Sequence, residues 1–243
     1  MNYFDKVDDP RRRWLIQALG AGMFSAASAD ALAQLFGSRP SRMPENKSIY
    51  RLQGDVMVDD KRATLDTKIT ETSTIVTPKS AEIVFVSGQQ AYVQRGDSRV
   101  ILERAERPQE GTFTRGLQLV TGALLSVFPR GTPMQLKTKT ATVGIRGTGV
   151  YLEADPEQTY FCTCYGVADV VANNDPSSRD TVVAKHHDRP LYITDTKNSG
   201  KNIRPAGFLN HTDQELMLIE TLVGRKPPFV FPKDDYSGPR RDY

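Results

Sequence analysis

The stretch Met134 to Glu153 (MQLKTKTATVGIRGTGVYLE) constrains the fold more than any other part of the chain, because its pattern changes in the middle. Before Gly144, apolar and polar residues alternate, which is typical of a strand with one buried face. A second β-rich segment starts at Val150. The three glycines in the six residues from Gly144 to Gly149 predict a bulge, a sharp bend or a close backbone approach between the segments.

A phosphate-binding loop is the alternative interpretation of these glycines. No helical pattern follows them, no Gly-Lys-Ser/Thr is present, and the G-x-G-x-x-G spacing is not met. The context therefore favours a bend in a β structure over a nucleotide site.

The segment Thr140 to Tyr151 resembles the strand-bend-strand core of the FecR domain family, the all-β periplasmic modules of iron-uptake regulators. The specific part is Arg146-Gly147-Thr148, and the resemblance extends over residues 49–172. The upstream segments that agree with it are Leu52 to Val58, Thr77-Pro78, Ala81 to Val86 and Leu119 to Val127. The resemblance implies a structural rather than catalytic Arg146. At a bend we also expect this side chain to be partly buried and paired with a carboxylate or with backbone carbonyls.

The pattern from Ile49 onward predicts an all-β fold, an antiparallel-rich β-sandwich or β-roll with a C-terminal helix packed on it. Short strand patterns separated by glycines recur along the chain. They are Ile49 to Leu52, Val56 to Val58, Thr74 to Val76, Glu82 to Val86, Gln90 to Gln94, Arg99 to Glu103, and strands around Gly122 within Thr112 to Val127.

The clearest local prediction is a helix over residues 213–223. Thr212 can serve as its N-cap with Glu215 three residues later, which is a capping box, and Gly224 ends it. An apolar stripe on this helix would pack on the β domain; it consists of Leu216, Ile219, Leu222 and Val223.

The first 33 residues resemble a twin-arginine export signal. Arg11 and Arg12 precede an apolar run, and Ala31-Leu32-Ala33 has the form of a cleavage site. The alternative, an uncleaved anchor, is disfavoured because the run is short and rich in small residues. We therefore expect a periplasmic protein without a stable transmembrane anchor after cleavage. Only about ten residues precede the apolar run, too few for the cytoplasmic anti-sigma segment of iron-uptake regulators.

The remaining divisions of the chain follow from composition and pattern. We predict a linker over 34–48, a FecR-like β domain over 49–172, a C-terminal extension over 173–226 and a disordered tail over 227–243. With 38% hydrophobic and 25% charged residues and a net charge of +3, the chain has the composition of a globular protein and no basic patch for nucleic acid.

Two cysteines and three histidines lie close together in the sequence. Cys162 and Cys164 stand at positions i and i+2 of a strand pattern, so both thiols share one face. The histidines His186, His187 and His211 all lie downstream. We predict one metal ion held by Cys162, Cys164, His187 and His211, with zinc as the default and iron or copper as alternatives. In an extended segment His186 would point away from its neighbour. The alternative is that the thiols only fill the core, since buried cysteine packs as a small hydrophobe.

Three functions stay open at this point. The first is a non-enzymatic periplasmic sensing, binding or scaffold module, in iron- or metal-related signalling, whose partner is a protein or small ligand of the cell envelope. The second is a metal-dependent enzyme, in which a Cys/His-bound ion keeps an open position. The third is a structural clamp, or no metal at all. Neither a Ser-His-Asp nor a paired-carboxylate signature is present.

Overall fold

The computed structural model describes residues 40–104, 115–196, 201–226 and 228. The export signal with Arg11 and Arg12, the start of the linker and almost all of the predicted tail lie outside the described residues. The described chain forms strands β1 (Ile49–Gln53), β2 (Met57–Val58), β3 (Lys61–Arg62), β4 (Thr74–Thr77), β5 (Glu82–Ser87), β6 (Gln90–Gln94), β7 (Ser98–Arg104), β8 (Arg115–Val127), β9 (Pro133–Lys137), β10 (Ala141–Ala154), β11 (Gln158–Ala172), β12 (Asp175–Ala184), β13 (Leu191–Thr194) and β14 (Ile203–Pro205), and helix α3 (Asp213–Leu222).

All these strands belong to one 14-stranded sheet, in which the described neighbours run antiparallel except for the parallel pair β8 and β9. The predicted all-β class with a C-terminal helix is confirmed. The sheet continues past residue 172, because β12 and β13 both pair with β11. Within the described residues, no helix has the length and apolar content needed to cross a membrane.

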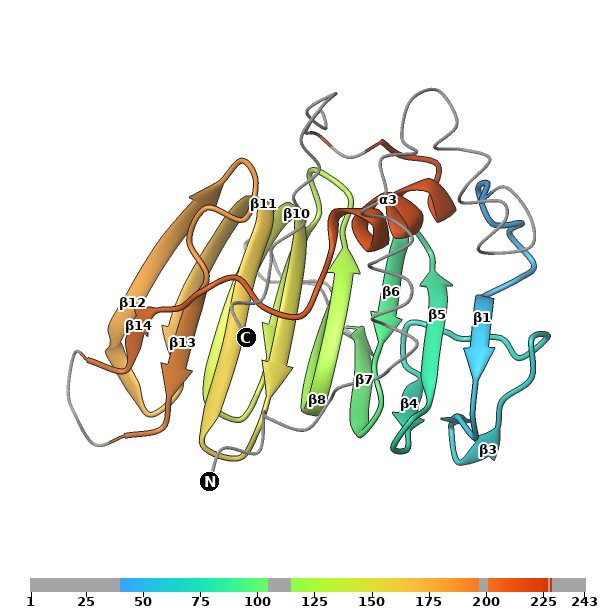
Figure 1. Ribbon diagram of the computed structural model, residues 1–243, viewed down its shortest axis with the longest axis horizontal. Helices are drawn as coiled ribbons and strands as arrows, with labels where there is room; N and C mark the ends of the chain where they lie inside the picture. Colours follow the sequence, from blue (N-terminus) through green and yellow to red (C-terminus); the bar gives the residue numbers. More distant parts are fainter. Residues whose placement is uncertain (1–39, 105–114, 197–200, 227, 229–243) are drawn as a thin grey trace, which may run out of the picture. The chain divides into compact units, whose positions relative to one another are not determined.

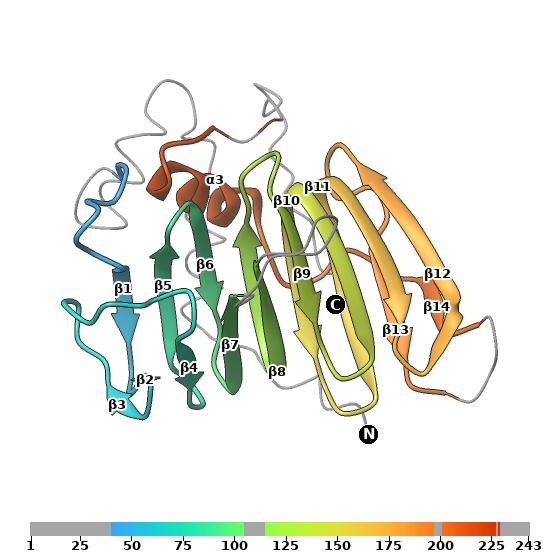
Figure 2. The ribbon, with the colours of Figure 1, turned by 180° about the vertical axis from the view of Figure 1, so that it is seen from behind.

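The long strands β8, β10 and β11 each change neighbours in the middle. The first half of β8 pairs with β7 and its second half with β6 and β10. The first half of β10 pairs with β9, and β11 pairs first with β13 and then with β12. The sheet therefore folds over itself along these strands. One layer contains β4, β7, β9 and β12, and the other contains β1, β5, β6 and β13 (Figures 1 and 2).

The long strands bend at glycines with positive φ: Gly122 in β8, Gly147 in β10 and Gly166 in β11. In β10 the pairing with β11 also shifts register between Arg146 and Gly149. The bend predicted from the glycine-rich stretch is thus present, and it carries β10 from one layer into the other.

Replacement of Gly147 by alanine is expected to destabilise the protein by about 2–3 kcal/mol. Gly147 has φ +61°, and a Cβ there would lie 2.7 Å from the Cα of Arg130. Gly131 provides a matched control, because it has φ +80° but no atom within 4 Å of a Cβ. Gly131→Ala should therefore cost only about 1 kcal/mol of backbone strain. Denaturant unfolding measures the loss of stability in each variant. Equal losses would contradict a steric effect of the close approach between Gly147 and Arg130.

The main apolar core takes side chains from both halves of each long strand. Leu117 and Leu124 of β8 and Val143 and Val150 of β10 are all buried in it. These side chains alternate with residues on the opposite face of the sheet, as the period of a strand requires.

The prediction that Arg146 is partly buried is wrong. Its side chain is 71% exposed, and its guanidinium lies 3.8 Å from the carboxylate of Asp169, which is itself 49% exposed. Because Ile145 points into the core, the alternation of β10 turns Arg146 outward. An ion pair this exposed contributes at most about 1 kcal/mol. In the described structure the buried members of the motif are Gly147 and Thr148.

Helix α3 has the predicted capping box. The Thr212 side chain accepts a hydrogen bond from the backbone N–H of Glu215, and the Glu215 side chain accepts one from the backbone N–H of Thr212. The helix ends at Leu222, one residue earlier than predicted, with Val223 as C-cap. Its predicted stripe residues Leu216, Ile219 and Leu222 are buried. The helix lies against β6 and β8 (Figures 1 and 2), and so covers part of a sheet face that the main core does not use.

Candidate metal centre

Strand β11 presents both cysteines on the sheet face opposite the main core. Phe161 belongs to the core cluster, whereas Cys162 and Cys164 do not, although both are fully buried. Cys162 pairs across the sheet with Tyr151 of β10. The two thiols therefore do not fill the space between the layers. They lie beneath polar and aromatic side chains of the chain downstream.

His187 lies in the turn between β12 and β13 and has φ +52°, a left-handed conformation. Its backbone N–H donates to the carbonyl oxygen of Cys164 at 2.9 Å, which fixes the turn beside the second cysteine. The carboxylate of Asp188 accepts hydrogen bonds from the backbone N–H groups of Lys185 at 2.6 Å and His186 at 3.2 Å. These contacts direct the His187 ring toward the thiols.

His211 comes from the segment that leads into α3. Its ring stacks on Tyr151, with centroids 4.4 Å apart, and it lies 4.3 Å from the ring of Phe208. The Tyr160 hydroxyl holds this segment, because it donates to the carbonyl oxygen of Gly207 at 3.0 Å and accepts from the backbone N–H of Leu209 at 3.1 Å. The segment therefore covers β10 and β11 and brings His211 over the cysteines.

The four predicted ligands converge. One ligand atom from each of Cys162, Cys164, His187 and His211 lies within 4.8 Å of the others. The Cys162 Sγ is 3.5 Å from the His187 Nδ1, and that Nδ1 is 3.1 Å from the His211 Nε2. In a tetrahedral zinc site with two thiolates and two imidazoles, ligand atoms are separated by roughly 3.3–3.8 Å. The two separations at His187 are close to this range, all four atoms lie within 4.8 Å, and the cluster has the donor set of such a site.

Hydrogen bonds fix which nitrogen of each ring faces the cluster. The His211 Nδ1 donates to the carbonyl oxygen of Leu209 at 2.6 Å, and the His187 Nε2 donates to the Asp213 carboxylate at 3.0 Å. In two neutral rings, the facing His187 Nδ1 and His211 Nε2 would both carry lone pairs. Two lone pairs this close repel each other unless a cation lies between them. That cation is either an extra proton or a metal ion.

The charges around His187 favour a cation at this point. Burial raises the pKa of Cys162, but hydrogen bonds with Cys164, His187 and His211 outweigh it and lower the pKa well below 9.0. Burial lowers the pKa of His187, but hydrogen bonds to Asp213 and Cys162 outweigh it and raise the pKa to about 8. Burial, with the neighbouring Cys162, raises the pKa of Cys164. Both shifts favour a negative Cys162 thiolate beside a positive charge over two neutral groups.

Asp213, the first residue of α3, is the member of the site that the sequence reasoning missed. It receives hydrogen bonds from His187 and also from the Nε2 of His186, at 2.8 and 3.0 Å. Burial opposes ionisation of Asp213, but the hydrogen bonds from both histidines hold its pKa below 3.8. A carboxylate on the second nitrogen of a ligating histidine is typical of metal sites. Its sequence signal is an acidic residue two positions after a candidate ligand.

His186 is not part of the four-ligand cluster, but the reason given from the sequence is wrong. The segment is a bend, not an extended strand, because His187 has positive φ. The two rings lie 4.8 Å apart and both reach Asp213, so His186 does not point away from its neighbour.

The thiol of Cys162, the imidazole of His187 and the carboxylate of Asp213 contact one another in series. This arrangement also resembles the catalytic triad of an enzyme with a cysteine nucleophile. Such a nucleophile must meet its substrate. Cys162 is fully buried, and the segment around Phe208 and His211 covers its surroundings, with Phe208 packed edge-on to His187 at 4.4 Å. The covered thiol therefore favours ion binding over substrate turnover.

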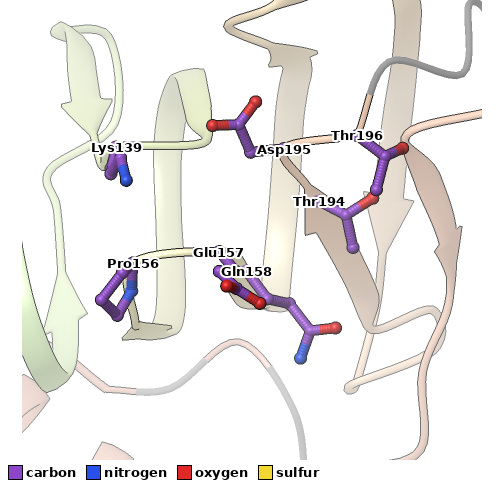
Figure 3. Close-up of a pocket in the computed structure, with 7 residues that line it drawn as sticks. All are labelled: Lys139, Pro156, Glu157, Gln158, Thr194, Asp195 and Thr196. Carbon is purple, nitrogen blue, oxygen red and sulfur yellow. The ribbon is translucent and has the colours of Figure 1, made fainter.

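A separate open pocket lies where the β10–β11 turn approaches the end of β13 (Figure 3). Its lining is largely polar and includes Lys139, Glu157 and Asp195. None of the four predicted ligands lines it.

No protein-family model matches the chain, and no curated protein matches it significantly. The chain is similar to two crystal structures, at 2.50 and 1.65 Å resolution, of a protein from Parabacteroides distasonis described as a candidate anti-sigma factor. In both comparisons the TM-score is 0.44 and the identity 13%, over 68% of this chain and 83% of that one. Membership of the FecR family stays a prediction.

Proposed function

We propose that the protein is an exported, non-enzymatic β module that binds one metal ion at Cys162, Cys164, His187 and His211. Zinc is the default ion, and iron or copper are the alternatives for the same soft ligands. The observation that carries the proposal is the convergence of all four ligand atoms within 4.8 Å. The ion would join β11, the β12–β13 turn and the segment before α3, three parts of the chain that are distant in sequence.

The burial of the ligands supports a closed site. Catalytic zinc keeps a position for water or substrate, whereas structural zinc has four protein ligands. Here Cys162 and Cys164 are fully buried, His211 is 2% exposed and the His187 side chain is 8% exposed. A metal-dependent enzyme with an open coordination position therefore has less support than a metal-clamped binding or scaffold module.

The proposed location is the periplasm, with a protein or small ligand of the cell envelope as partner. The sequence features that support this are the twin-arginine-type segment at Arg11 and Arg12 and the FecR-like core at Arg146, Gly147 and Thr148. Because the twin-arginine route carries folded proteins, a metal-clamped protein can be loaded before export.

The test is metal content and ligand identity. Protein purified without chelator is expected to contain one ion per chain, and Co²⁺ in its place should show a thiolate-to-cobalt charge-transfer band. The Cys162→Ser/Cys164→Ser variant should lose both signals. Thr163→Val is the matched control, because Thr163 is equally buried between the two cysteines but lies on the other face of β11.

The control should keep the ion and the charge-transfer band. If wild-type protein binds no stoichiometric ion, or if the double variant binds the ion as wild type does, the proposed site is wrong. An exchangeable water in place of one of the four protein ligands in the loaded protein would move the assignment to the metal-dependent enzyme.

A further inference from the structure

A second group of metal-ligating side chains lies on the solvent side of the cluster. His186, His187 and Asp213 each offer a ligand atom, and these atoms also lie within 4.8 Å of one another. Both groups contain His187. Its Nδ1 faces the buried thiols, and its Nε2 faces Asp213. The two edges of one imidazole ring thus belong to two adjacent ligand sets.

The two sets differ sharply in exposure. The His186 side chain is 48% exposed, whereas the side chains of Asp213 and His187 are 10% and 8% exposed. The inner thiols are inaccessible to solvent. An ion that reaches the inner ligands from this side therefore meets His186 and Asp213 before it meets sulfur.

Asp213 accepts more hydrogen bonds than are needed to orient the His187 ring. One hydrogen bond from the His187 Nε2 would fix that ring. The Nε2 of His186 also approaches both oxygens of the same carboxylate, at 2.8 and 3.0 Å. Two imidazole nitrogens converging on one ionised carboxylate form a facial set of two nitrogens and one oxygen. Such a set binds Zn²⁺ and similar divalent ions with water in the remaining positions.

We propose that His186, Asp213 and the Nε2 of His187 form an outer divalent-metal site from which the buried site is loaded. The loading role rests on the proposed function, because the buried cluster is the destination of the ion; the outer site itself does not. An ion on the Nε2 displaces the proton that this nitrogen donates to Asp213, and the proton passes to solvent. When the ion moves to the Nδ1 among the thiols, the Nε2 takes a proton back from solvent and again donates it to Asp213. The outer site is therefore a transit site, and the loaded protein holds one ion.

Removing the inner thiols isolates the outer site. In Cys162→Ser/Cys164→Ser, Zn²⁺ added alone is expected to bind weakly, and calorimetry should show this binding disappear when His186→Gln is added. Glutamine keeps a hydrogen-bond donor for Asp213 but is a poor metal ligand. Arg189→Ala is the control in the same turn, since its side chain is also 48% exposed and contacts Asp180 rather than Asp213.

Loading kinetics test the transit role. Stopped-flow mixing of metal-free protein with Co²⁺ follows the charge-transfer band of the buried thiolates, which an ion at the sulfur-free outer site does not produce. His186→Gln is expected to slow the rise of this band by at least about tenfold and to leave its final amplitude unchanged. Arg189→Ala should load without this slowing.

The two proposals fail in different ways. A wild-type rate in His186→Gln, with no His186-dependent binding in the double serine background, would overturn the outer site and leave the buried site intact. A wild-type protein without a charge-transfer band would overturn the buried site and the loading role. Weak Zn²⁺ binding that depends on His186 would then still support the outer site.

Discussion

Chelation of the ion is expected to lower the thermal midpoint of the loaded protein by roughly 8–16 °C. A ligand that binds only the folded state adds about 4 kcal/mol of stability when its free concentration is a thousand times its Kd. For a domain of 150–250 residues, each kcal/mol shifts the midpoint by about 2–4 °C. Without the ion, the His187 Nδ1 and His211 Nε2 still face each other at 3.1 Å in a buried site. Differential scanning calorimetry with and without chelator measures the shift.

Chelation should destabilise particular segments more than the rest of the protein. The segment from Gly207 to His211 and the turn from Lys185 to Asp188 are the parts that the ion would join to β11, so their amides should exchange faster after chelation. Strand β5 has no ligand and should change little. The Cys162→Ser/Cys164→Ser variant is the control, and chelator should leave its midpoint unchanged. A chelator-insensitive wild type, or the same shift in the variant, would refute the clamp.

The sequence predicted the parts of this site that depend on local periodicity. The alternation of strand side chains predicted that Cys162 and Cys164 share one face of a strand, and both residues lie in strand β11. The capping box of Thr212 and Glu215 predicted the start of α3, and therefore the position of His211 just before it. These inferences hold because strand alternation and helix capping depend on residues only a few positions apart.

Features that depend on distant contacts were missed. Strands β12, β13 and β14 were not predicted, and the first two complete the sheet through pairing with β11. His187 adopts positive φ because its N–H reaches the Cys164 carbonyl, which no pattern around residue 187 reveals. In the sequence, Asp213 follows the candidate ligand His211 by two positions, but an acidic residue in the first turn of a helix is favourable without any metal site. Its contact with two histidines follows from the docking of that helix on the sheet.

The replacement Arg95→Met is expected to reduce the free energy of unfolding by roughly 3 kcal/mol, because it leaves two carboxylates without their shared partner. The guanidinium lies 2.6 Å from Glu82 of β5 and also contacts Glu215 of α3. The Arg95 side chain is only 15% exposed. Burial lowers the pKa of Arg95, but the two carboxylates outweigh this effect and raise the pKa. This ion pair joins the helix to the sheet independently of the metal ligands, so the variant should keep its ion.

The variant Glu215→Gln separates the contribution of the Glu215 charge from that of the capping hydrogen bond that its side chain accepts. Glutamine at this position can still accept the hydrogen bond from the backbone N–H of Thr212, so only the ion pair with Arg95 is lost. If the two residues stabilise the fold through each other, Arg95→Met/Glu215→Gln should lose less stability than the sum of the single variants, by about 1 kcal/mol or more. Strict additivity in denaturant unfolding would show that the contact between helix and sheet contributes nothing through this pair.

Arg51 supplies the matched control, because it contacts the same carboxylate of Glu82 from a more exposed position. Its side chain is 42% exposed, against 15% for Arg95. An exposed ion pair contributes about 0–1 kcal/mol, since water screens the charges and solvates the partner that remains. Arg51→Met should therefore have a much smaller effect than Arg95→Met. Equal losses would mean that burial beneath α3 does not strengthen the Arg95 interaction, and that the helix is held by its apolar stripe and by the site at His211 and Asp213.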